Sequence, residues 1–301
     1  VYNWLRFNAK TMLDVIVRHG VTSLCAPPVV WRQLLNENLA NYPVRLREVV
    51  SSGQPLDAEI IRHVEKRWSL TVRDGYGQTE TTAIIGNTPG TTIKQGSMGK
   101  VLPGYKVALL DAAGAHVDEG EIALPLDPRP MGLMLGYQDD WGKTIDPGQD
   151  GWYRTGDVAR RDADGYYHYV GRADDLFKSA EYRISPFELE SVLLEHEAVA
   201  AAAVVPSAGR DGLIVPKAVI ELGDGFAAGD ALAEEVLRFT RARLAPYQRI
   251  RRVEFGDLPK TMTGKIRRVE LRRREEDLRR EGERAADEFW EEDFPTLAEE
   301  A

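Results

Sequence analysis

Apolar positions in the first 80 residues follow two periods in turn. Stretches with apolar side chains three and four positions apart predict helices. Short apolar runs that end at Pro or Gly are typical of buried strands. Alternation of the two favours an α/β fold with a largely parallel sheet, whose ligands bind beyond the carboxyl ends of the strands. Helices are expected at 10–20, 29–40 and 57–68, and strands at 21–28, 46–56 and 70–77.

The pattern changes twice further along the chain. From roughly residue 96 to 170, short β-like runs separated by Gly, Pro and Asp predict a small β-rich subdomain. Beyond residue 171, helical and strand-like periods mix again and predict a compact α+β domain. The last 26 residues, 276–301, follow a charge-dense helix and turn acidic, so we expect a solvated tail. The α+β elements are helices at 185–196 and 229–248, and strands at 199–206 and 215–222.

Composition narrows the class of protein. The 301 residues are long enough for two domains, and 43% hydrophobic with 29% charged residues is globular. A net charge of −9 argues against a nucleic-acid polymer as partner. No apolar run is long enough to span a membrane. A single cysteine, Cys25, forms no internal disulfide, which predicts a reducing, cytoplasmic location, and its apolar run predicts that it is buried.

One short stretch, DGYGQTETTA at 74–83, joins flexible glycines to an aromatic ring, an amide, a hydroxyl and a carboxylate. A ring can stack on a base, N–H groups and a hydroxyl can meet a phosphate, and a carboxylate can bind Mg²⁺. Further along, Asp157 follows a tight turn, Arg172 adjoins a second one, and Lys265 lies on a Thr-Gly loop. Each feature alone is weak, because such turns and exposed lysines are common.

Several residues near these stretches have ordinary structural explanations. Ser185, Pro186 and Glu188 have the pattern of a helix N-terminus with a capping box. The aromatic residues of the strand-like run 165–171 are assigned to packing; they are Tyr166, Tyr167 and Tyr169. The basic run near 267–280 is interleaved with acids at helical spacing and is interpreted as a solvated face.

In their order and spacing, the segments YGQTET, YRTGD, GRADD and TGKIRR resemble the adenylate-forming superfamily, most closely acetyl and medium-chain acyl-CoA synthetases. The resemblance covers nearly the whole chain except the acidic tail. It implies that residues 1–171 are the distal part of a large α/β N-terminal domain with its β-rich subdomain. It also implies that residues 172–275 are a small, mobile α+β C-terminal domain.

The resemblance implies a reaction in two steps. A carboxylic acid and ATP, with Mg²⁺, give acyl-adenylate and pyrophosphate, and the thiol of CoA then displaces AMP. Lys265, Thr79 and Glu80 take catalytic roles, with Glu80 on the metal, and Asp174 is the hinge. A glycine at position 77 leaves room for acids larger than acetate. The nucleotide-binding set is Gly53, Gln54, Pro55, Asp74, Tyr76, Gly77, Gln78, Thr79, Asp157, Arg172 and Arg183.

Two departures from the family pattern leave alternatives open. The family's Gly/Ser/Thr-rich phosphate loop is absent, so we expect an N-terminally truncated form whose active site is incomplete. Glu181 stands beside the expected thiol tunnel, where the family pattern has glycine. A carboxylate there favours an alternative in which the adenylate is passed to a carrier protein. A non-catalytic, nucleotide-binding fragment is the second alternative.

Overall fold

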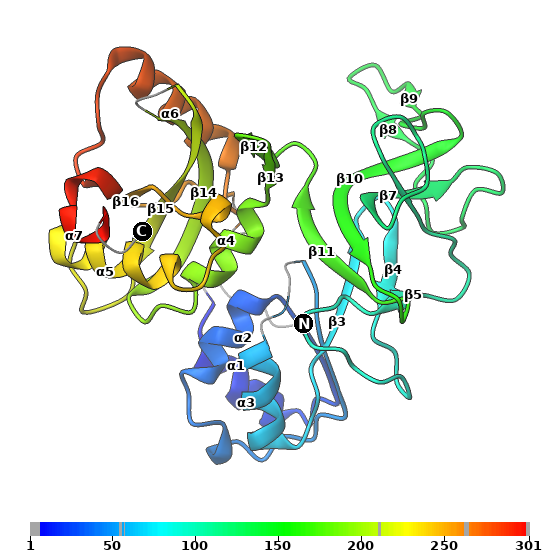
Figure 1. Cartoon of the computed structure of the whole chain (residues 1–301). Helices are drawn as coiled ribbons and strands as arrows, with labels where there is room; N and C mark the ends of the chain where they lie inside the picture. The colour runs from blue at the N-terminus through cyan, green and yellow to red at the C-terminus, as the bar shows by residue number, and fades with distance from the viewer. Residues whose placement is uncertain (1–6, 54–55, 57, 210–211, 262–264, 299–301) are drawn as a thin grey trace. The chain divides into compact units, whose positions relative to one another are not determined.

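The computed structural model describes residues 7–53, 56, 58–209, 212–261 and 265–298 (Figure 1). The chain divides into two compact units, Val1–Tyr169 and Val170–Ala301. The α/β class predicted from the sequence is confirmed. Within the described residues no helix is long and apolar enough to cross a membrane.

The first unit begins with a five-stranded sheet in the order β1-β2-β3-β4-β5. Strands β1, β2 and β3 pair in parallel, as the alternating pattern predicts, whereas β4 and β5 add antiparallel. The strands are β1 (Ser23–Ala26), β2 (Glu48–Ser51), β3 (Arg73–Gln78), β4 (Thr82–Gly86) and β5 (Lys100–Val101). The helices of this part are α1 (Ala9–Arg18), α2 (Pro28–Leu35), the short η1 (Leu39–Asn41) and α3 (Ala58–Trp68).

The helices of this unit pack on alternate residues of the parallel strands. Leu24 and Val49 lie in one core with Trp31 of α2 and Val64 of α3. Cys25, between two buried neighbours on β1, is exposed, so the expectation that it is buried was wrong. The physical reason is the period of a strand, because successive side chains point to opposite faces of the sheet.

A β-rich part follows in the same unit. Its main sheet has the order β11-β10-β7-β6, with a separate two-stranded ribbon of β8 and β9. Strand β10 pairs with β7 up to Arg154 and again from Val158, and the intervening residues form a bulge. Bulges redirect side chains, and this one carries the YRTGD motif. The strands are β6 (Ala108–Leu110), β7 (Glu119–Pro125), β8 (Tyr137–Gln138), β9 (Thr144–Ile145), β10 (Trp152–Arg161) and β11 (Tyr167–Arg172).

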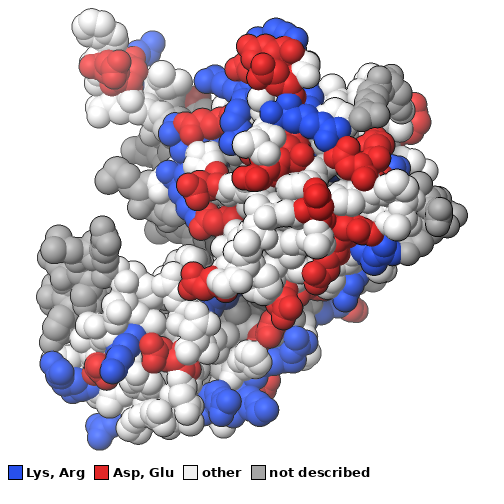
Figure 2. All heavy atoms as spheres, turned by 90° about the vertical axis from the view of Figure 1, so that its left-hand side faces the viewer, with Lys and Arg blue, Asp and Glu red and all other residues white. Residues whose placement is uncertain are grey.

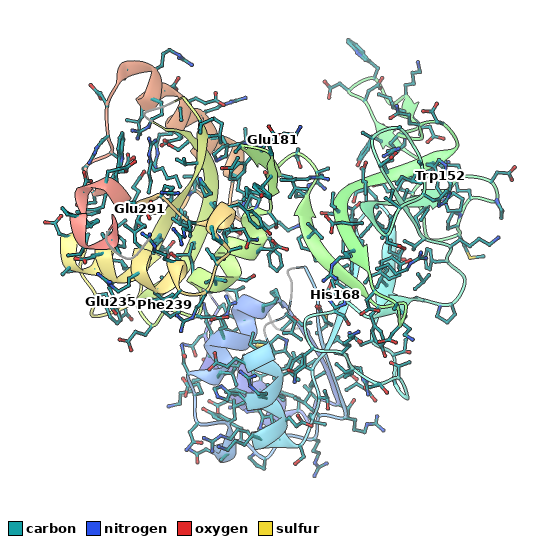
Figure 3. The ribbon with its side chains drawn as sticks, in the orientation of Figure 1. Trp152, His168, Glu181, Glu235, Phe239 and Glu291 are labelled. Carbon is teal, nitrogen blue, oxygen red and sulfur yellow. The ribbon has the colours of Figure 1, made fainter. Side chains whose placement is uncertain are left out.

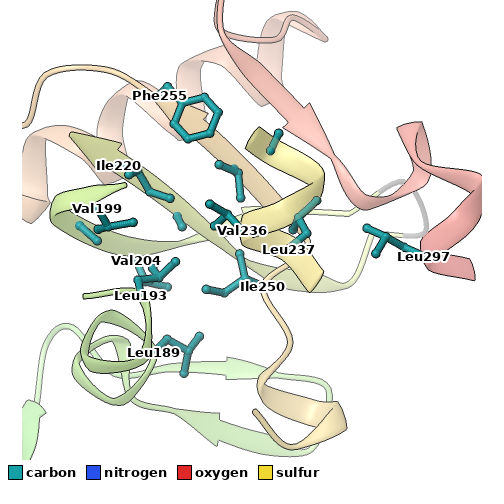
Figure 4. Packing of buried hydrophobic residues seen from close by; sticks show 14 of the residues in the cluster. Leu189, Leu193, Val199, Val204, Ile220, Val236, Leu237, Ile250, Phe255 and Leu297 are labelled. Atoms are coloured by element: carbon teal, nitrogen blue, oxygen red, sulfur yellow. The ribbon is translucent and has the colours of Figure 1, made fainter. Parts of the chain in front are cut away.

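The second unit is built on a four-stranded sheet in the order β14-β15-β16-β17. Its core joins Leu189 of α4, Val236 of α5 and Ile220 of β15 (Figure 4). Ser185 accepts a hydrogen bond from the Glu188 N–H at 3.2 Å, which confirms the predicted cap. The elements are β12 (Phe177–Ser179), β13 (Tyr182–Ile184), α4 (Pro186–Leu193), β14 (Val199–Ala208), β15 (Ile214–Leu222), α5 (Asp230–Arg241), η2 (Pro246–Gln248), β16 (Arg252–Phe255), α6 (Arg268–Glu281), β17 (Glu288–Trp290), η3 (Glu291–Asp293) and α7 (Pro295–Ala298).

The acidic C-terminal segment is not the solvated tail that its composition predicts. Strand β17 pairs antiparallel with β16 and completes the sheet. Phe294 and Leu297 are buried in the core of the second unit. The segment is acidic, but the burial of these two apolar side chains holds it against the unit. Its Glu288 carboxylate also pairs with a buried positive charge.

That positive charge belongs to Lys217 of β15, which is fully buried. Its Nζ lies 2.8, 2.6 and 3.0 Å from carboxylate oxygens of Glu254, Glu275 and Glu288. Burial acts to raise the pKa of Glu288, but Lys217 and neighbouring donors hold that pKa below its usual value. A buried charge without such partners costs several kcal/mol, so Lys217 fixes where α6 and β17 dock.

Lys217→Met is therefore expected to lower the free energy of unfolding by roughly 3–5 kcal/mol, because it leaves three buried glutamates without their shared cation. Lys260→Met is the matched control. Lys260 pairs with Glu221 at 2.6 Å, but both side chains are about one-third exposed, and such pairs contribute no more than about 1 kcal/mol. Urea unfolding of the two variants measures the difference. Equal losses of unfolding free energy in the two variants would show that the buried cluster contributes no more than an exposed ion pair.

Candidate functional site

The DGYGQTETTA stretch is the turn between the last parallel strand and the first antiparallel one. Strand β3 ends at Gln78 and β4 begins at Thr82. A Cβ on Gly77 would lie 1.9 Å from the carbonyl oxygen of Thr82. Glycine is thus required by the close approach of the two strands, whatever space it leaves for an acid.

Asp157 is the centre of the polar network in this unit. It lies in the β10 bulge and is only 6% exposed. Its Oδ2 accepts hydrogen bonds from the Tyr76 hydroxyl at 2.7 Å and from Gln78 Nε2 at 2.6 Å. Its Oδ1 accepts one from the Tyr169 hydroxyl at 3.1 Å. Hydrogen bonds to an ionised acceptor are the strong ones, so this carboxylate ties β3, β10 and β11 together.

Gln78 is held on both sides of its amide. Its Nε2 also donates to the carbonyl oxygen of Thr155 at 2.8 Å, and its Oε1 accepts from the Tyr153 hydroxyl at 3.1 Å. Its backbone N–H donates to Thr81 Oγ1 at 3.0 Å. The side chain therefore has one orientation, which places its two polar atoms between the turn and the bulge.

Two of the phenols in the network are kept protonated. Burial, followed by the charge of Asp157, raises the pKa of Tyr76 far above its usual value. Burial also raises the pKa of Tyr153, with further contributions from Tyr137 and Glu80. Both hydroxyls are thus hydrogen-bond donors across the physiological range of pH.

Thr79 and Glu80 lie at the tip of the turn. Thr79 is exposed and Glu80 is partly exposed. The Tyr137 hydroxyl donates to Glu80 Oε1 at 3.0 Å, and the Met134 N–H donates to the Glu80 carbonyl oxygen at 2.7 Å. The turn thus presents oxygen ligands only, which suits Mg²⁺ bound by one carboxylate together with substrate phosphates.

Among the described residues, Glu254, Glu275 and Glu288 are the one group of three side chains close enough to hold a metal ion. They do not form a metal centre, because the Lys217 ammonium already lies among them at 2.6 to 3.0 Å. The metal-binding role assigned to Glu80 stays a prediction.

The other predicted residues of the second unit lie on exposed segments. Arg172 Nε is 3.2 Å from Asp174 Oδ1. Glu181 is exposed between β12 and β13, next to Ala180 with a φ of +50° (Figure 3). Lys265 is also exposed, and its N–H donates to Thr261 Oγ1 at 3.1 Å. Arg183 is exposed on β13.

The structure brings some predicted residues of the first unit together and leaves others apart. Tyr76, Gln78 and Asp157 are brought into direct contact. Gly53 is exposed with a φ of +94°, a conformation that favours glycine. Gln54 and Pro55 lie outside the described residues.

Sequence analysis missed four members of the network. Tyr169 was assigned to packing alone, but its hydroxyl also contacts Asp157. Tyr153 and Thr155 both contact Gln78. They lie in the YRTGD segment beside Asp157, so their place in that motif could have identified them. Tyr137 lies 57 residues from Glu80, and no local pattern links the two.

On the face of the protein shown in Figure 2, acidic and basic side chains are interspersed, and the basic ones form no continuous region. The exclusion of a nucleic-acid polymer rests on net charge and stays a prediction.

Comparisons with known proteins agree with the motifs. The model of the AMP-binding enzyme family matches residues 1–137, and that of the AMP-binding enzyme C-terminal domain matches residues 188–265. The 4-hydroxybutyrate–CoA ligase 1 of Metallosphaera sedula is 47% identical over 94% of this chain and 51% of that protein. The mitochondrial acyl-coenzyme A synthetase ACSM3 of Mus musculus is 40% identical over 90% of this chain and 48% of its own.

Solved structures give the same result. The anthranilate CoA ligase AuaEII, in complex with anthranoyl-AMP, has a TM-score of 0.78 and 34% identity, over 89% of this chain and 52% of that one. ATP-bound MatB from Rhodopseudomonas palustris has a TM-score of 0.78 and 27% identity, over 91% of this chain and 54% of that one. The chain spans about half the length of the curated relatives it matches.

Asp74 gives this unit a measurable dependence on pH. Burial raises the pKa of its carboxyl to about 7, against the lowering effect of the Leu56 and Gly75 N–H groups. A carboxyl whose folded pKa is raised penalises folding when ionised. The penalty is absent below its unfolded pKa near 4, grows as the pH rises toward 7, and then stays constant.

Asp74→Asn removes the ionisation and should stabilise the protein relative to wild type only as the pH rises from about 4 to 7, by no more than ~4 kcal/mol. Urea unfolding of both proteins at several values of pH measures this difference. A difference that does not change with pH would contradict the buried position of Asp74.

Proposed function

The chain belongs to the AMP-binding enzyme family, and from that premise we propose that it forms part of an acid–thiol ligase that makes acyl-CoA. In the first step a carboxylate oxygen attacks the α-phosphorus of ATP, and pyrophosphate leaves. In the second step the sulfur of CoA attacks the acyl carbon, its proton is lost, and AMP leaves. The observation that carries the proposal is the buried Asp157 joined to Tyr76 and Gln78.

These three side chains form a rigid wall suited to a nucleoside. The hydrogen bond from the Tyr76 hydroxyl to Asp157 limits rotation of the ring that is assigned to adenine stacking. We propose that Asp157 binds the ribose, because its carboxylate is an acceptor that can exchange one of its present donors for a ribose hydroxyl. A site whose groups are held in place before binding loses less entropy when the nucleotide enters.

The phosphates require positive charge, since a carboxylate and an α-phosphate repel each other. Magnesium, when bound, would neutralise the phosphate oxygens, and Glu80 is the ligand proposed for it. The hydroxyl of Thr79 is proposed to meet the α-phosphate. Lys265 is proposed to reach the reacting oxygens in the first step. Its exposed position suits a group that acts in one step and leaves before the next.

Relatives support a CoA ligase without fixing the acid. Their names include 4-hydroxybutyrate–CoA ligase and anthranilate CoA ligase, so an acid larger than acetate is proposed here. A cytoplasmic location stays a prediction, because the relatives include mitochondrial enzymes. Loading of a carrier protein is kept as the second candidate because of the carboxylate at Glu181.

The test is ATP–pyrophosphate exchange followed by CoA thioester formation, with acetate, butyrate, 4-hydroxybutyrate and benzoate as acids. It uses this chain alone and this chain joined to the half of the 4-hydroxybutyrate–CoA ligase that the match does not cover. Acid-dependent exchange in either form supports the proposal. Exchange in neither form, with both folded, would reject it.

Lys265→Ala in the active form should lower the adenylation rate by about 10²–10³, taking the loss of an oxyanion-hole donor as a guide. Thioester formation from a supplied acyl-adenylate should change little, because the lysine is needed in the first step only. Lys260→Met, five residues earlier, is the control for a change of loop charge. Equal losses of rate in both half-reactions would contradict a role for Lys265 in the first step only.

Glu181→Gly should raise the rate of thioester formation a few-fold and leave adenylation unchanged. The side chain is exposed, so its effect on CoA is expected through charge more than through bulk, and exposed charge interactions contribute about 1 kcal/mol or less. Glu181→Gln keeps the size and removes the charge, so it should reproduce most of the gain. No change in either variant would remove the basis for the carrier-protein alternative.

A further inference from the structure

Helix α6 begins directly after the loop that carries Lys265. The base of this loop is closed by the Arg267 N–H, which donates to the Pro259 carbonyl oxygen at 2.8 Å. It is also closed by the Thr261 N–H, which donates to the Lys265 carbonyl oxygen at 2.8 Å. Lys260 and Ile266 form an isolated antiparallel bridge across the same base. Any shift of the first turn of α6 is therefore passed to Lys265.

The first two turns of α6 carry two arginines that meet two acids. Arg272 Nη1 donates a hydrogen bond to Asp175 Oδ1, and Arg268 Nη1 lies 3.8 Å from Asp175 Oδ2. Arg268 also donates two hydrogen bonds to Glu190 of α4, one from Nε to Oε1 at 3.1 Å and one from Nη2 to Oε2. All four side chains are at most one-quarter exposed, and their charges cancel. Partial burial makes such a set stronger than an exposed pair.

Asp175 adjoins Asp174, the predicted hinge. The N–H groups of Asp175 and Leu176 both donate to the Arg172 carbonyl oxygen, at 3.1 and 3.2 Å. This tight turn fixes the Asp175 carboxylate to the segment that contains the hinge. Asp175 and Arg272 are 97 positions apart in the sequence. Their side chains nevertheless form a hydrogen bond, which joins the hinge segment to the start of α6.

We propose that Asp175 is a positioning residue for Lys265. Through Arg272 and Arg268 it joins the hinge segment to the start of α6, so that a rotation of the backbone at Asp174 carries Lys265 and the base of its loop with it. This inference rests on the proposed function, because it takes Lys265 as the group that serves the adenylation step.

The rest of α6 does not need Asp175 in order to dock. Leu271 is buried against β14, and Glu275 contacts the buried Lys217 at 2.6 Å. Arg279 is also bound to Glu275 and Glu288. Loss of the Asp175 contacts should thus loosen the start of the helix and the adjoining loop, while the core of the unit remains intact.

The test is Asp175→Asn, which keeps the shape of the side chain and removes its charge. Amide hydrogen exchange at Thr261, Lys265 and Arg267 should become about tenfold faster, whereas exchange at Val219 in the middle of β15 should not change. Asp277→Asn is the matched control, because Asp277 pairs with Arg280 on the exposed side of the same helix at 2.9 Å. Asp175→Glu should restore most of the protection.

In the active form of the protein, Asp175→Asn should lower kcat for adenylation about tenfold with little change in KM for ATP, and should spare thioester formation from supplied acyl-adenylate. Unchanged loop exchange, or equal loosening of loop and core, would overturn the positioning role. Loosening without any effect on adenylation would also overturn it. If the loop responds but no form of the protein makes acyl-adenylate, the coupling stands and the proposed function fails.

Discussion

The need to satisfy buried charge is the constraint on which both units depend. In the second unit Lys217 is fully buried, and three glutamates from β16, α6 and β17 surround it. In the first unit Asp157 is buried, and hydroxyl and amide donors from β3 and β11 surround it. An uncompensated charge in either place would cost several kcal/mol, so each charge dictates which strands and helices must meet around it.

Asp157 is buried and Lys265 is exposed, and this difference suits the separate roles proposed for them. Two phenols of the Asp157 network, Tyr76 and Tyr153, are kept protonated, which suits a wall that must hold a nucleoside in one orientation. Lys265 is exposed on a loop, which suits a charge that must arrive for one step and leave for the next. The ion pairs of Asp175 with α6 join the hinge segment to the base of this loop.

Local patterns predicted the elements well but misjudged some of their surroundings. The helical period of α1 and α3 and the cap at Ser185 involve residues a few positions apart, so they could be recognised in the sequence. Cys25 and the acidic C-terminal segment were misjudged. Their burial depends on which face of a strand is covered and on whether a distant lysine needs a carboxylate, and neither property has a local signal.

The sequence by itself determined the α/β class, the order of the motifs and most of the candidate chemistry, because glycine turns, helix caps and the residues Asp74, Gln78 and Asp157 lie in short, ordered segments. Tertiary structure alone decided which of these residues share a site. Tyr76 meets Asp157 across 81 positions, and Tyr169 joins the same carboxylate from a third strand. Contacts of this range are set by strand order and by the β10 bulge, which emerge only when the whole unit packs.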